Sequence, residues 1–577
     1  MEDQRNVLAD RRPAHRLLAT VFRHGGPWVA VLPAASLLLA AAETALPALL
    51  GRALDAVVTG DDAGRWLVAA ALLVAVLTFS DTLDDLAAGL SSARATSWLR
   101  RSVLGHVLAT GPRAARRFAA GDLVTRLVAN AAEAGRFATV STWAVTSVLP
   151  ALGGVVALAL IDPWLCLAFL AGAPLLIRLV RSGVRDASDL ADDYLRVQGG
   201  IASRLLDALA GARSIAAAGT WERERDRVLA PLPELHRHGT GMWDVQTRLA
   251  SREALLVPLL EVVVLAVAGF ELARGRITVG DLLAASQYVV LAAGLGSVAG
   301  VAPQLAMVRS AAGRTAQVFA EPPVRYGTEP LPPGPGRLEF RGVGAGTVLR
   351  DLDLDVPGGV LVALVGRSGS GKSLLAALAG RLTDPDEGEV RLDGVALPRL
   401  DRRELRAAVG YGFERPVLLG ETLADVIAFG QDVPTDARVT AAARDARADG
   451  FVRRMPEGYR SRLADARMSG GEVQRLGLAR AFVHAGRVLV LDDVAASLDT
   501  VTEHHIQEVL TGPLADRTRL VVAHRASTAS RADLVVWLDG GRVRAVGPHH
   551  DLAADPEYRA LFGPAAVAPR VPAGRPG

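Results

Sequence analysis

The chain contains one lysine and one cysteine among its 577 residues, and aromatic residues make up only 5% of it. The single cysteine, Cys166, cannot form a disulfide within the chain, so nothing points to a disulfide-stapled extracellular domain. No short repeat is visible and half of the residues are hydrophobic, which excludes a fibrous or a disordered protein. With a mean hydropathy of +0.27, the composition is too apolar for an ordinary soluble enzyme and predicts at least one membrane-embedded domain.

Arginine supplies nearly all of the basic residues, and the net charge at pH 7 is +3. The arginine bias accompanies abundant alanine, glycine and valine, so it is a compositional feature that says little about partners. The chain has no compact basic stripe with interleaved aromatic residues, and we therefore expect no nucleic-acid partner. The one lysine, Lys372, indicates a position that needs a compact point-charge ammonium, which the forked guanidinium of arginine does not replace.

Long apolar runs are confined to the first 310 residues. Six of them are long enough, at about 1.5 Å per residue, to cross a hydrocarbon core of about 30 Å. We expect a multi-pass domain in the cell membrane over residues 26–319, after a cytoplasmic segment over residues 1–25, because arginines are concentrated before the first span. The predicted spans are Trp28–Leu50, Trp66–Asp85, Trp143–Ile161, Trp164–Val184, Ala254–Leu272 and Leu282–Val301.

The remaining segments differ sharply in composition from the spans. Two Arg-rich, helix-periodic segments of roughly 60 to 70 residues separate the second span from the third and the fourth from the fifth, and they predict long cytoplasmic helices. Proline and glycine are dense in residues 320–336, which predicts an extended linker. Strand-like runs then alternate with helical windows, so residues 337–563 are predicted to form a soluble α/β domain. Residues 564–577 are predicted to be a disordered tail.

The single lysine belongs to a glycine-rich motif, GRSGSGKS, that follows the apolar run LVALV and precedes the helical run LLAALAGRL. This order of strand, loop and helix is the context that a phosphate-binding P-loop requires. Backbone N–H groups and the helix dipole favour a polyanion, while Lys372 reaches the β- and γ-phosphates and the Ser373 hydroxyl ligates Mg²⁺. The predicted phosphate-binding residues are Gly366, Arg367, Ser368, Gly369, Ser370, Gly371, Lys372 and Ser373.

Two acids end a second apolar run, VLVLDD, further along the chain. Asp492 suits a metal-holding carboxylate at the carboxyl end of a strand beside a P-loop, and Asp493 stands where an attacking water would be polarised. Between the two motifs, the string MSGGEVQR places Ser469, Gly470 and Gly471 at the start of a helix. Such a start either binds a phosphate through its N-terminal amides or is a plain helix cap.

Together these residues resemble the ATP-binding cassette (ABC) transporters, specifically the exporter-type half-transporter with six spans fused ahead of one nucleotide-binding domain. The resemblance covers nearly all of the chain. It implies a multi-domain fold, in which an all-α six-helix transmembrane domain is followed by an α/β P-loop NTPase cassette, with ATP and Mg²⁺ as ligands. It also implies a cytoplasmic cassette and ATP-driven export of a small molecule, a peptide or a lipid-like compound.

The resemblance also implies roles for single residues. In this family the Ser-Gly-Gly motif, whose last residue here is Glu472, completes the ATP site of a second half-transporter, so two cassettes close face to face. Asp499 in SLD matches the D-loop, and His524 in VVAHR matches the switch histidine that contacts the γ-phosphate. The strings FAAGDLVTRL and LDALAGARSIAAAG look like the two coupling loops of these exporters.

Four positions depart from the family pattern. Asp493 stands where members place glutamate, and its shorter side chain retracts the carboxylate by about an ångström. Glu414 replaces the Q-loop glutamine, where an acid still ligates Mg²⁺ but adds negative charge near the phosphates. Glu472 replaces a glutamine, and no aromatic residue that would stack on adenine occurs between Phe340 and Leu349. We therefore expect a slow ATP site in a heterodimer, and the alternative is an active homodimer that tolerates Asp493.

Acidic residues inside the predicted spans need an explanation, because charge is unfavourable in hydrocarbon. One interpretation is an acid-lined cavity for cationic substrates. The other is that the glutamates make interhelical hydrogen bonds and that the aspartates lie in the water-filled cytoplasmic extension. Three functions stay open at this point: an exporter, an importer built on the same fold, and a weakly hydrolysing subunit that regulates a partner. The acids concerned are Glu43, Asp81, Asp84, Asp85 and Glu261.

Overall fold

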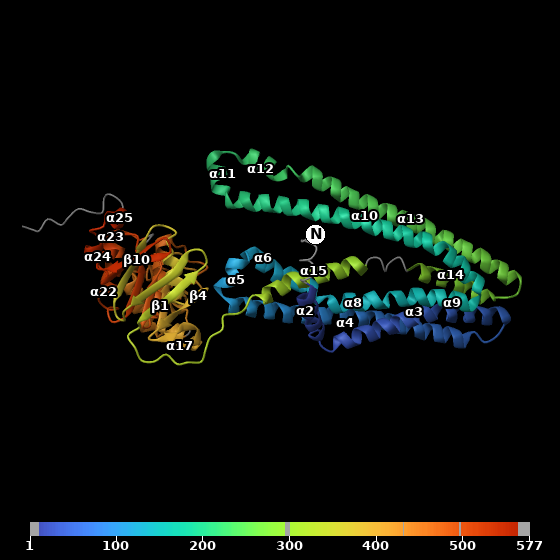
Figure 1. Cartoon of the computed structure of the whole chain (residues 1–577). Helices are drawn as coiled ribbons and strands as arrows, with labels where there is room; N and C mark the ends of the chain where they lie inside the picture. The colour runs from blue at the N-terminus through green and yellow to red at the C-terminus, as the bar shows by residue number, and fades with distance from the viewer. Residues whose placement is uncertain (1–10, 295–300, 431, 495–497, 563–577) are drawn as a thin grey trace, which may run out of the picture. The chain divides into compact units, whose positions relative to one another are not determined.

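A computed structural model of the chain describes residues 11–294, 301–430, 432–494 and 498–562. The predicted tail and the first ten residues lie outside this range. The main division of the chain falls between Pro322 and Pro323 and separates a helical unit, which we call the membrane unit, from an α/β unit, which we call the cassette. Figure 1 colours the membrane unit from blue to yellow-green and the cassette from yellow to red.

The membrane unit consists of helices joined by short turns. Its elements are α2 (Arg11–Arg23), α3 (Trp28–Thr59), α4 (Gly64–Thr110), α5 (Pro112–Arg117), α6 (Ala120–Thr125), η1 (Arg126–Asn130), α7 (Ala131–Gly135), α8 (Phe137–Thr146), α9 (Val148–Ile161), α10 (Pro163–Ala210), α11 (Ala212–Ala218), α12 (Trp221–Leu229), α13 (Leu232–Ala273), α14 (Val279–Ala293) and α15 (Val301–Ala320). The longest helices, α4, α10 and α13, have 47, 48 and 42 residues, about twice what a hydrocarbon core requires. They supply the helical extensions that the sequence predicts, and α10 and α13 lie side by side (Figure 1).

Four of the six predicted spans lie in helices that are long and apolar enough to cross a membrane: Trp28–Thr59, Gly64–Thr110, Ala120–Ile161 and Ala254–Ala273. The other two fall on shorter apolar helical stretches, Pro163–Leu175 and Val279–Ala293, and the end of the predicted sixth span lies outside the described residues. Only 11 to 28% of the most apolar window of each long helix is buried inside the unit. The remaining apolar side chains need lipid or another protein surface to cover them, because their exposure to water is unfavourable.

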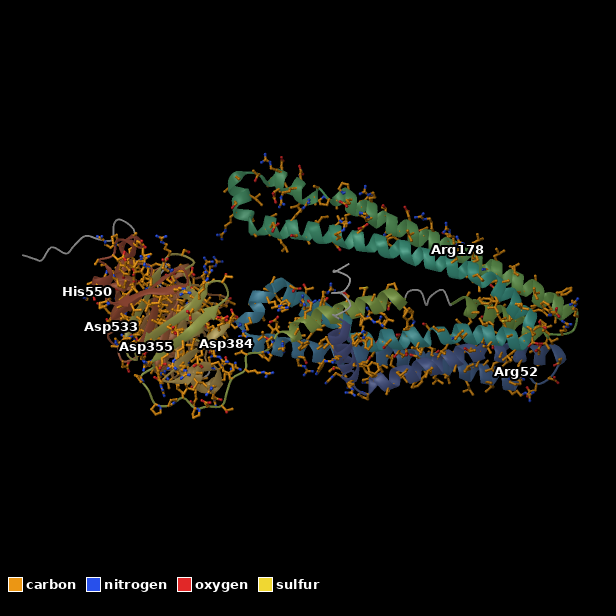
Figure 2. All side chains as sticks on the ribbon, viewed as in Figure 1. Arg52, Arg178, Asp355, Asp384, Asp533 and His550 are labelled. Atoms are coloured by element: carbon orange, nitrogen blue, oxygen red, sulfur yellow. The ribbon has the colours of Figure 1, made fainter. Side chains whose placement is uncertain are left out.

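Polar contacts fix the helix ends at one end of the membrane unit. The guanidinium of Arg52, labelled in Figure 2, lies 5.4 Å from the centre of the Trp66 ring, across the turn between α3 and α4. The carboxylate of Asp55 accepts hydrogen bonds from the Thr278 hydroxyl and the Gly280 N–H, both at 2.6 Å. These contacts hold the end of α3 to the start of α14. Both helices contribute residues to the wall of one cavity.

The cassette contains two β-sheets, drawn as arrows in Figure 1. The smaller sheet is antiparallel, in the order β2-β1-β4-β5, and consists of β1 (Leu338–Ala345), β2 (Leu349–Val356), β4 (Glu387–Leu392) and β5 (Val395–Ala396). The larger sheet has the order β10-β9-β3-β8-β7-β6, parallel except at β10. Its strands are β3 (Leu361–Gly366), β6 (Val409–Gly412), β7 (Val488–Leu491), β8 (Thr518–Val522), β9 (Leu534–Asp539) and β10 (Arg542–Gly547).

Helices complete the α/β cassette, and the predicted fold class is confirmed. Every residue of β7 and β8 is buried, as a parallel sheet covered on both faces requires. Because β3, β6 and β7 run parallel, their carboxyl ends meet at one edge of the sheet, where the sequence motifs follow them. The helices are α16 (Lys372–Ala379), α17 (Arg402–Ala408), α18 (Leu423–Ala428), α19 (Asp436–Asp445), α20 (Asp449–Val452), α21 (Gly470–Val483), α22 (Thr500–Thr511), α23 (Ala526–Ala529), α24 (His549–Leu552) and α25 (Pro556–Ala560).

A buried arginine ties the segment that resembles the first coupling loop to the last helix of the membrane unit. Arg126 is 7% exposed and opens the one-turn π-helix η1. Its guanidinium donates to the Gln317 side chain at 3.0 Å and to the Arg314 carbonyl, both in α15, and pairs with Asp122 at 2.9 Å. A displacement of this segment is therefore transmitted to α15 through hydrogen bonds.

We expect Arg126→Gln to lower the midpoint of thermal unfolding by several degrees, since losing the hydrogen bonds of a buried cation costs about 2–3 kcal/mol. Arg101→Gln is the matched control, because Arg101 is exposed and donates only to Ser97, one turn earlier in its own helix, among the described residues. Thermal unfolding of the purified variants, followed by intrinsic fluorescence in one detergent, is the measurement. Equal midpoints for the two variants would contradict a structural role for the Arg126 contacts.

Candidate functional site

The loop after β3 has the backbone conformation that its glycines predict. Gly366, Gly369 and Gly371 have φ angles of +152°, +80° and +100°, a region that other residues rarely adopt. A side chain at Gly371 would also meet Leu349 of β2. Helix α16 begins at the next residue, so its unpaired N–H groups face the loop. The backbone is thus open to an anion.

The Lys372 side chain folds back over this loop. Its Nζ donates to the carbonyl oxygens of Gly366 and Arg367, at 2.8 and 2.9 Å. Burial lowers the pKa of Lys372, and the nearby carboxylates of Asp493 and Asp492 oppose that shift. The two hydrogen bonds hold Nζ of Lys372 at the loop, where a phosphate chain would need it.

The two residues predicted to ligate Mg²⁺ from the P-loop and from the second strand motif are in contact. The Ser373 hydroxyl, in the first turn of α16, donates to Oδ1 of Asp492, after β7, at 2.8 Å. The two residues are 119 positions apart in sequence, and β3 and β7 are separated in the sheet by β8. A hydroxyl and a carboxylate side by side are oxygen ligands of the kind that Mg²⁺ prefers.

Three carboxylates gather at the same edge of the sheet. Burial raises the pKa of both Asp492 and Asp493, and the charge of Glu414 raises both further. Nε2 of His524 lies 3.6 Å from Oδ2 of Asp493 and opposes the shift. Asp493 has a φ angle of +48°, a left-handed backbone of the kind often found at functional sites. This excess of negative charge favours a bound cation.

The site fits ATP with Mg²⁺ by the chemistry of its polar groups. The buried hydroxyl of Ser370 has no hydrogen-bond partner among the described residues, and a phosphate oxygen would satisfy it. Ser373 and Asp492 would hold Mg²⁺, with Glu414 as a further oxygen donor; Glu414 is half-exposed and lies 3.6 Å from Arg415. Within the described ranges no three His, Cys, Asp or Glu side chains are grouped closely enough to hold a metal ion by themselves.

Val348 is a partly exposed side chain beside the P-loop. A Cβ atom built at Gly371 would lie 3.3 Å from Cγ1 of Val348. An aliphatic side chain offers adenine an apolar contact but no π face. The expected loss of adenine stacking stays a prediction.

The Ser-Gly-Gly motif begins helix α21, and its serine is already hydrogen-bonded within the chain. The carboxylate of Glu472 accepts hydrogen bonds from the N–H and from the hydroxyl of Ser469, both at 2.8 Å, which forms a capping box. These bonds lower the pKa of Glu472, so the carboxylate is ionised at neutral pH. An anion therefore already occupies the donors that a phosphate would use at this helix start.

Asp499 lies at the start of α22, where it caps the helix. Its carboxylate accepts hydrogen bonds from two backbone N–H groups and, at 2.8 Å, from the Thr502 hydroxyl. A contact that the sequence analysis missed lies nearby: Arg525, next to His524, pairs with the buried Glu503 of α22. This pair ties the histidine loop to the helix that Asp499 caps. Sequence offers no signal for it, because the two residues meet only in the folded cassette.

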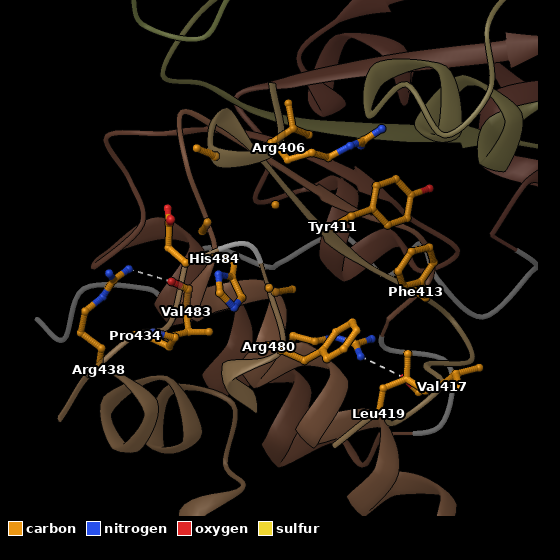
Figure 3. A pocket seen from close by; sticks show the side chains of 18 of the residues that line it. Arg406, Tyr411, Phe413, Val417, Leu419, Pro434, Arg438, Arg480, Val483 and His484 are labelled. Atoms are coloured by element: carbon orange, nitrogen blue, oxygen red, sulfur yellow. Dashed lines mark hydrogen bonds between the residues drawn. The ribbon is translucent and has the colours of Figure 1, made fainter. Parts of the chain in front are cut away.

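A groove with a volume of about 990 Å³ lies elsewhere on the cassette, around β6 and α21 (Figure 3). Its wall includes the neighbouring rings of Tyr411 and Phe413 and the exposed side chains of Val417 and Leu419. Arg480 donates to the Val417 carbonyl at 2.9 Å and so holds the segment after Glu414. Exposed apolar side chains in a groove mark an interaction surface. The sequence analysis missed the groove because distant segments line it.

The five acids predicted for a substrate cavity do not gather at one place. Glu43 lines a cavity of about 460 Å³ in the membrane unit, which we call the Glu43 cavity, and Asp81 is close enough to interact with Glu43 electrostatically. Asp84 accepts a hydrogen bond from Ser36 of α3 at 2.5 Å, an interhelical contact that the alternative interpretation expected of the glutamates and not of the aspartates. Asp85 and Glu261 are not among the residues that line this cavity. Of the five predicted acids, Glu43 alone lines this cavity, and Asp81 lies near Glu43.

Comparison with known proteins decides the family. Residues 349–496 match the family described as ABC transporter, and residues 29–293 match the ABC transporter transmembrane region. The chain is 50% identical over 534 residues to the ABC transporter ATP-binding protein RamA of Streptomyces coelicolor, a match that covers 92% of this chain and 84% of that protein. The chain belongs to the ABC transporter family. This confirms the resemblance that the motifs indicate.

Two further relatives extend the comparison. A structure of a bacterial Atm1-family ABC exporter with ATP bound is similar with a TM-score of 0.76 and 25% identity, covering 94% of this chain and 98% of that chain. A mitochondrial potassium channel ATP-binding subunit of Xenopus tropicalis is 34% identical over 455 residues, which are 75% of this chain and 65% of that protein. The ABC transporter described here is thus an exporter-type half-transporter. Such half-transporters bind ATP, couple its hydrolysis to transport and act as dimers in the membrane.

We expect Lys372→Ala to weaken ATP binding at this chain's own site by about ten-fold or more, because the chain has no other lysine to contact the phosphates. Arg367→Ala is the control: it removes a positive charge from the same loop but leaves the ammonium in place, and binding should change far less. Equilibrium titration of the purified protein with a fluorescent ATP analogue measures both. Unchanged affinity in Lys372→Ala would contradict the assigned role.

Proposed function

We propose that this half-transporter is the slow-site subunit of a heterodimeric exporter. The observation that carries the proposal is Asp493, whose carboxylate is shorter than that of the usual glutamate and lies among Asp492, Glu414 and His524. A water molecule held by this shorter side chain is displaced by about an ångström from the γ-phosphate, which is enough to slow its attack. The helix start at Ser469 keeps its serine and both glycines and departs from the family motif only at Glu472, so it can serve the partner's site.

The transported compound in this proposal is a small molecule, a peptide or a lipid-like compound that moves outward. A second candidate function, a weakly hydrolysing regulatory subunit, is favoured by the name of one relative, the mitochondrial potassium channel ATP-binding subunit. ATPase activity separates the two candidates. A transporter's ATPase rate rises when its substrate is present, whereas a regulatory subunit responds to its partner and not to a transported compound.

Glu472→Gln should lower the ATP concentration needed for half-maximal turnover of the assembled dimer several-fold, because an anion beside the bound phosphate is removed while the cap geometry is kept. Asp425→Asn is the matched control, since Asp425 forms the same capping box with Thr422 at the start of α18. Steady-state ATPase titrations of both variants give the comparison. Identical effects of the two substitutions would mean that Glu472 acts only as a helix cap.

The purified chain alone should hydrolyse ATP poorly, and adding its partner subunit should restore turnover. Within that heterodimer, Asp493→Glu should change the rate only modestly, whereas Ser469→Glu should nearly abolish it, because the productive site would lose its phosphate-binding helix start. ATPase rates of the separate and mixed subunits are the measurement. Vigorous, cooperative activity of the chain alone that disappears in Asp493→Asn would establish the homodimer instead.

A further inference from the structure

We propose that the Glu43 cavity binds an organic ammonium ion with an apolar body. The inference names the ligand class of the exporter proposed above and rests on that proposed function only for the transport of the ligand. Binding of the ligand depends only on the membrane unit, so ligand binding and the proposed exporter function can be tested separately.

The cavity has the size and the wall of a small-molecule site. Its volume of about 460 Å³ falls in the range of about 300–1,000 Å³ that is usual for ligand pockets. Of the twelve residues that line it, three have polar side chains, Glu43, Ser147 and Gln287, and apolar residues such as Leu46, Leu77 and Leu291 form most of the rest. A mostly apolar wall with a few convergent polar groups suits a ligand with an apolar body and one polar end.

Two prolines add hydrogen-bond acceptors near the cavity. Pro47 of α3 and Pro150 of α9 both line it. A proline has no N–H, so the carbonyl four residues earlier does not receive its usual helical hydrogen bond. Those carbonyls belong to Glu43 and Thr146, which lie on the same helical faces as the prolines. The hydroxyl of Ser147, buried at the junction of α8 and α9, has no hydrogen-bond partner among the described residues.

The one ionisable side chain among the described residues that line the cavity, Glu43, is acidic. None of the described residues that line the cavity is basic. The charged group that acts on Glu43 is another acid, Asp81, one helical turn beyond the cavity-lining Leu77. A carboxylate at membrane depth is normally paired or faces a polar cavity. A cation in the cavity supplies the missing partner.

The Glu43 cavity offers more hydrogen-bond acceptors than donors, which restricts the class of ligand further. A primary or secondary ammonium carries N–H donors for the Glu43 carboxylate, for the carbonyls to which the two prolines donate no hydrogen bond, and for the Gln287 side-chain oxygen. A quaternary ammonium would satisfy the charge and leave these acceptors unpaired. A metal cation would leave the apolar wall without a contact. The combination therefore favours a protonated amine attached to an apolar group.

The test uses the full-length chain in lipid nanodiscs and two matched fluorescent probes. One is a dansylated pentylammonium, and the other is its neutral N-acetyl derivative, titrated by fluorescence anisotropy with empty nanodiscs as background. Glu43→Gln should weaken binding of the ammonium probe about ten-fold or more and change binding of the acetylated probe less than about two-fold. Glu261→Gln is the matched control, since it removes an acid from another helix that does not line the cavity, and both probes should bind it as they bind the unaltered chain.

Asp81→Asn provides a second variant that leaves the cavity wall intact, and it should weaken the ammonium probe about two- to five-fold. If Glu43→Gln does not yield folded protein, this variant decides the question. Equal loss of both probes in Glu43→Gln, or no loss in either variant, overturns the inference. ATP binding is measured in the same nanodiscs. A chain that binds ATP but shows no preference for the ammonium probe contradicts ammonium binding in the Glu43 cavity and leaves the proposed function standing. A chain that prefers the ammonium but does not bind ATP refutes the proposed function alone.

Discussion

An excess of carboxylates over cationic side chains is the constraint on which the ATP-site edge of the cassette depends. The hydrogen bond from Ser373 to Asp492 brings a P-loop hydroxyl onto a strand-end carboxylate, and Asp493 and Glu414 add two more acids around one lysine. Burial raises the pKa of both aspartates, so this edge is unfavourable while it is empty of cations. Binding of Mg²⁺ with a phosphate chain relieves the excess charge, which couples nucleotide binding to the order of this edge.

The same electrostatic reasoning applies to the helix start at Ser469, with the opposite result. There the positive end of the helix dipole is already matched by the Glu472 carboxylate, which holds both donors of Ser469. An incoming phosphate must displace this carboxylate before it gains the same donors. The cassette thus has a sheet edge with an excess of carboxylates and a helix start that its own Glu472 caps. Because of both features, we expect its closure with a second cassette to depend on the charge of the bound nucleotide.

Charge also organises the membrane unit, where little water is available to screen it. Arg126 is satisfied by α15 and Asp122 and so joins two segments rigidly, whereas Glu43 has no basic partner among the residues around its cavity. The contacts of Arg126 are thus structural. Glu43 lacks a basic partner of this kind, and the cationic ligand proposed above supplies it. Glu43 lies on α3, whose end is fixed by the polar contacts of Asp55.

The sequence by itself determined the features whose residues are neighbours along the chain. The P-loop is a contiguous strand, loop and helix, and four spans are recognised from length and apolarity, so the family and the α/β fold of the cassette followed without coordinates. The other two predicted spans fall on the apolar helical stretches Pro163–Leu175 and Val279–Ala293. Only the tertiary structure decided that Ser373 meets Asp492, that Arg525 pairs with Glu503, and that Glu43 lines a cavity that Glu261 does not line. The physical reason is that these contacts depend on strand order, helix rotation and rotamer choice, which residues far apart in the sequence set together.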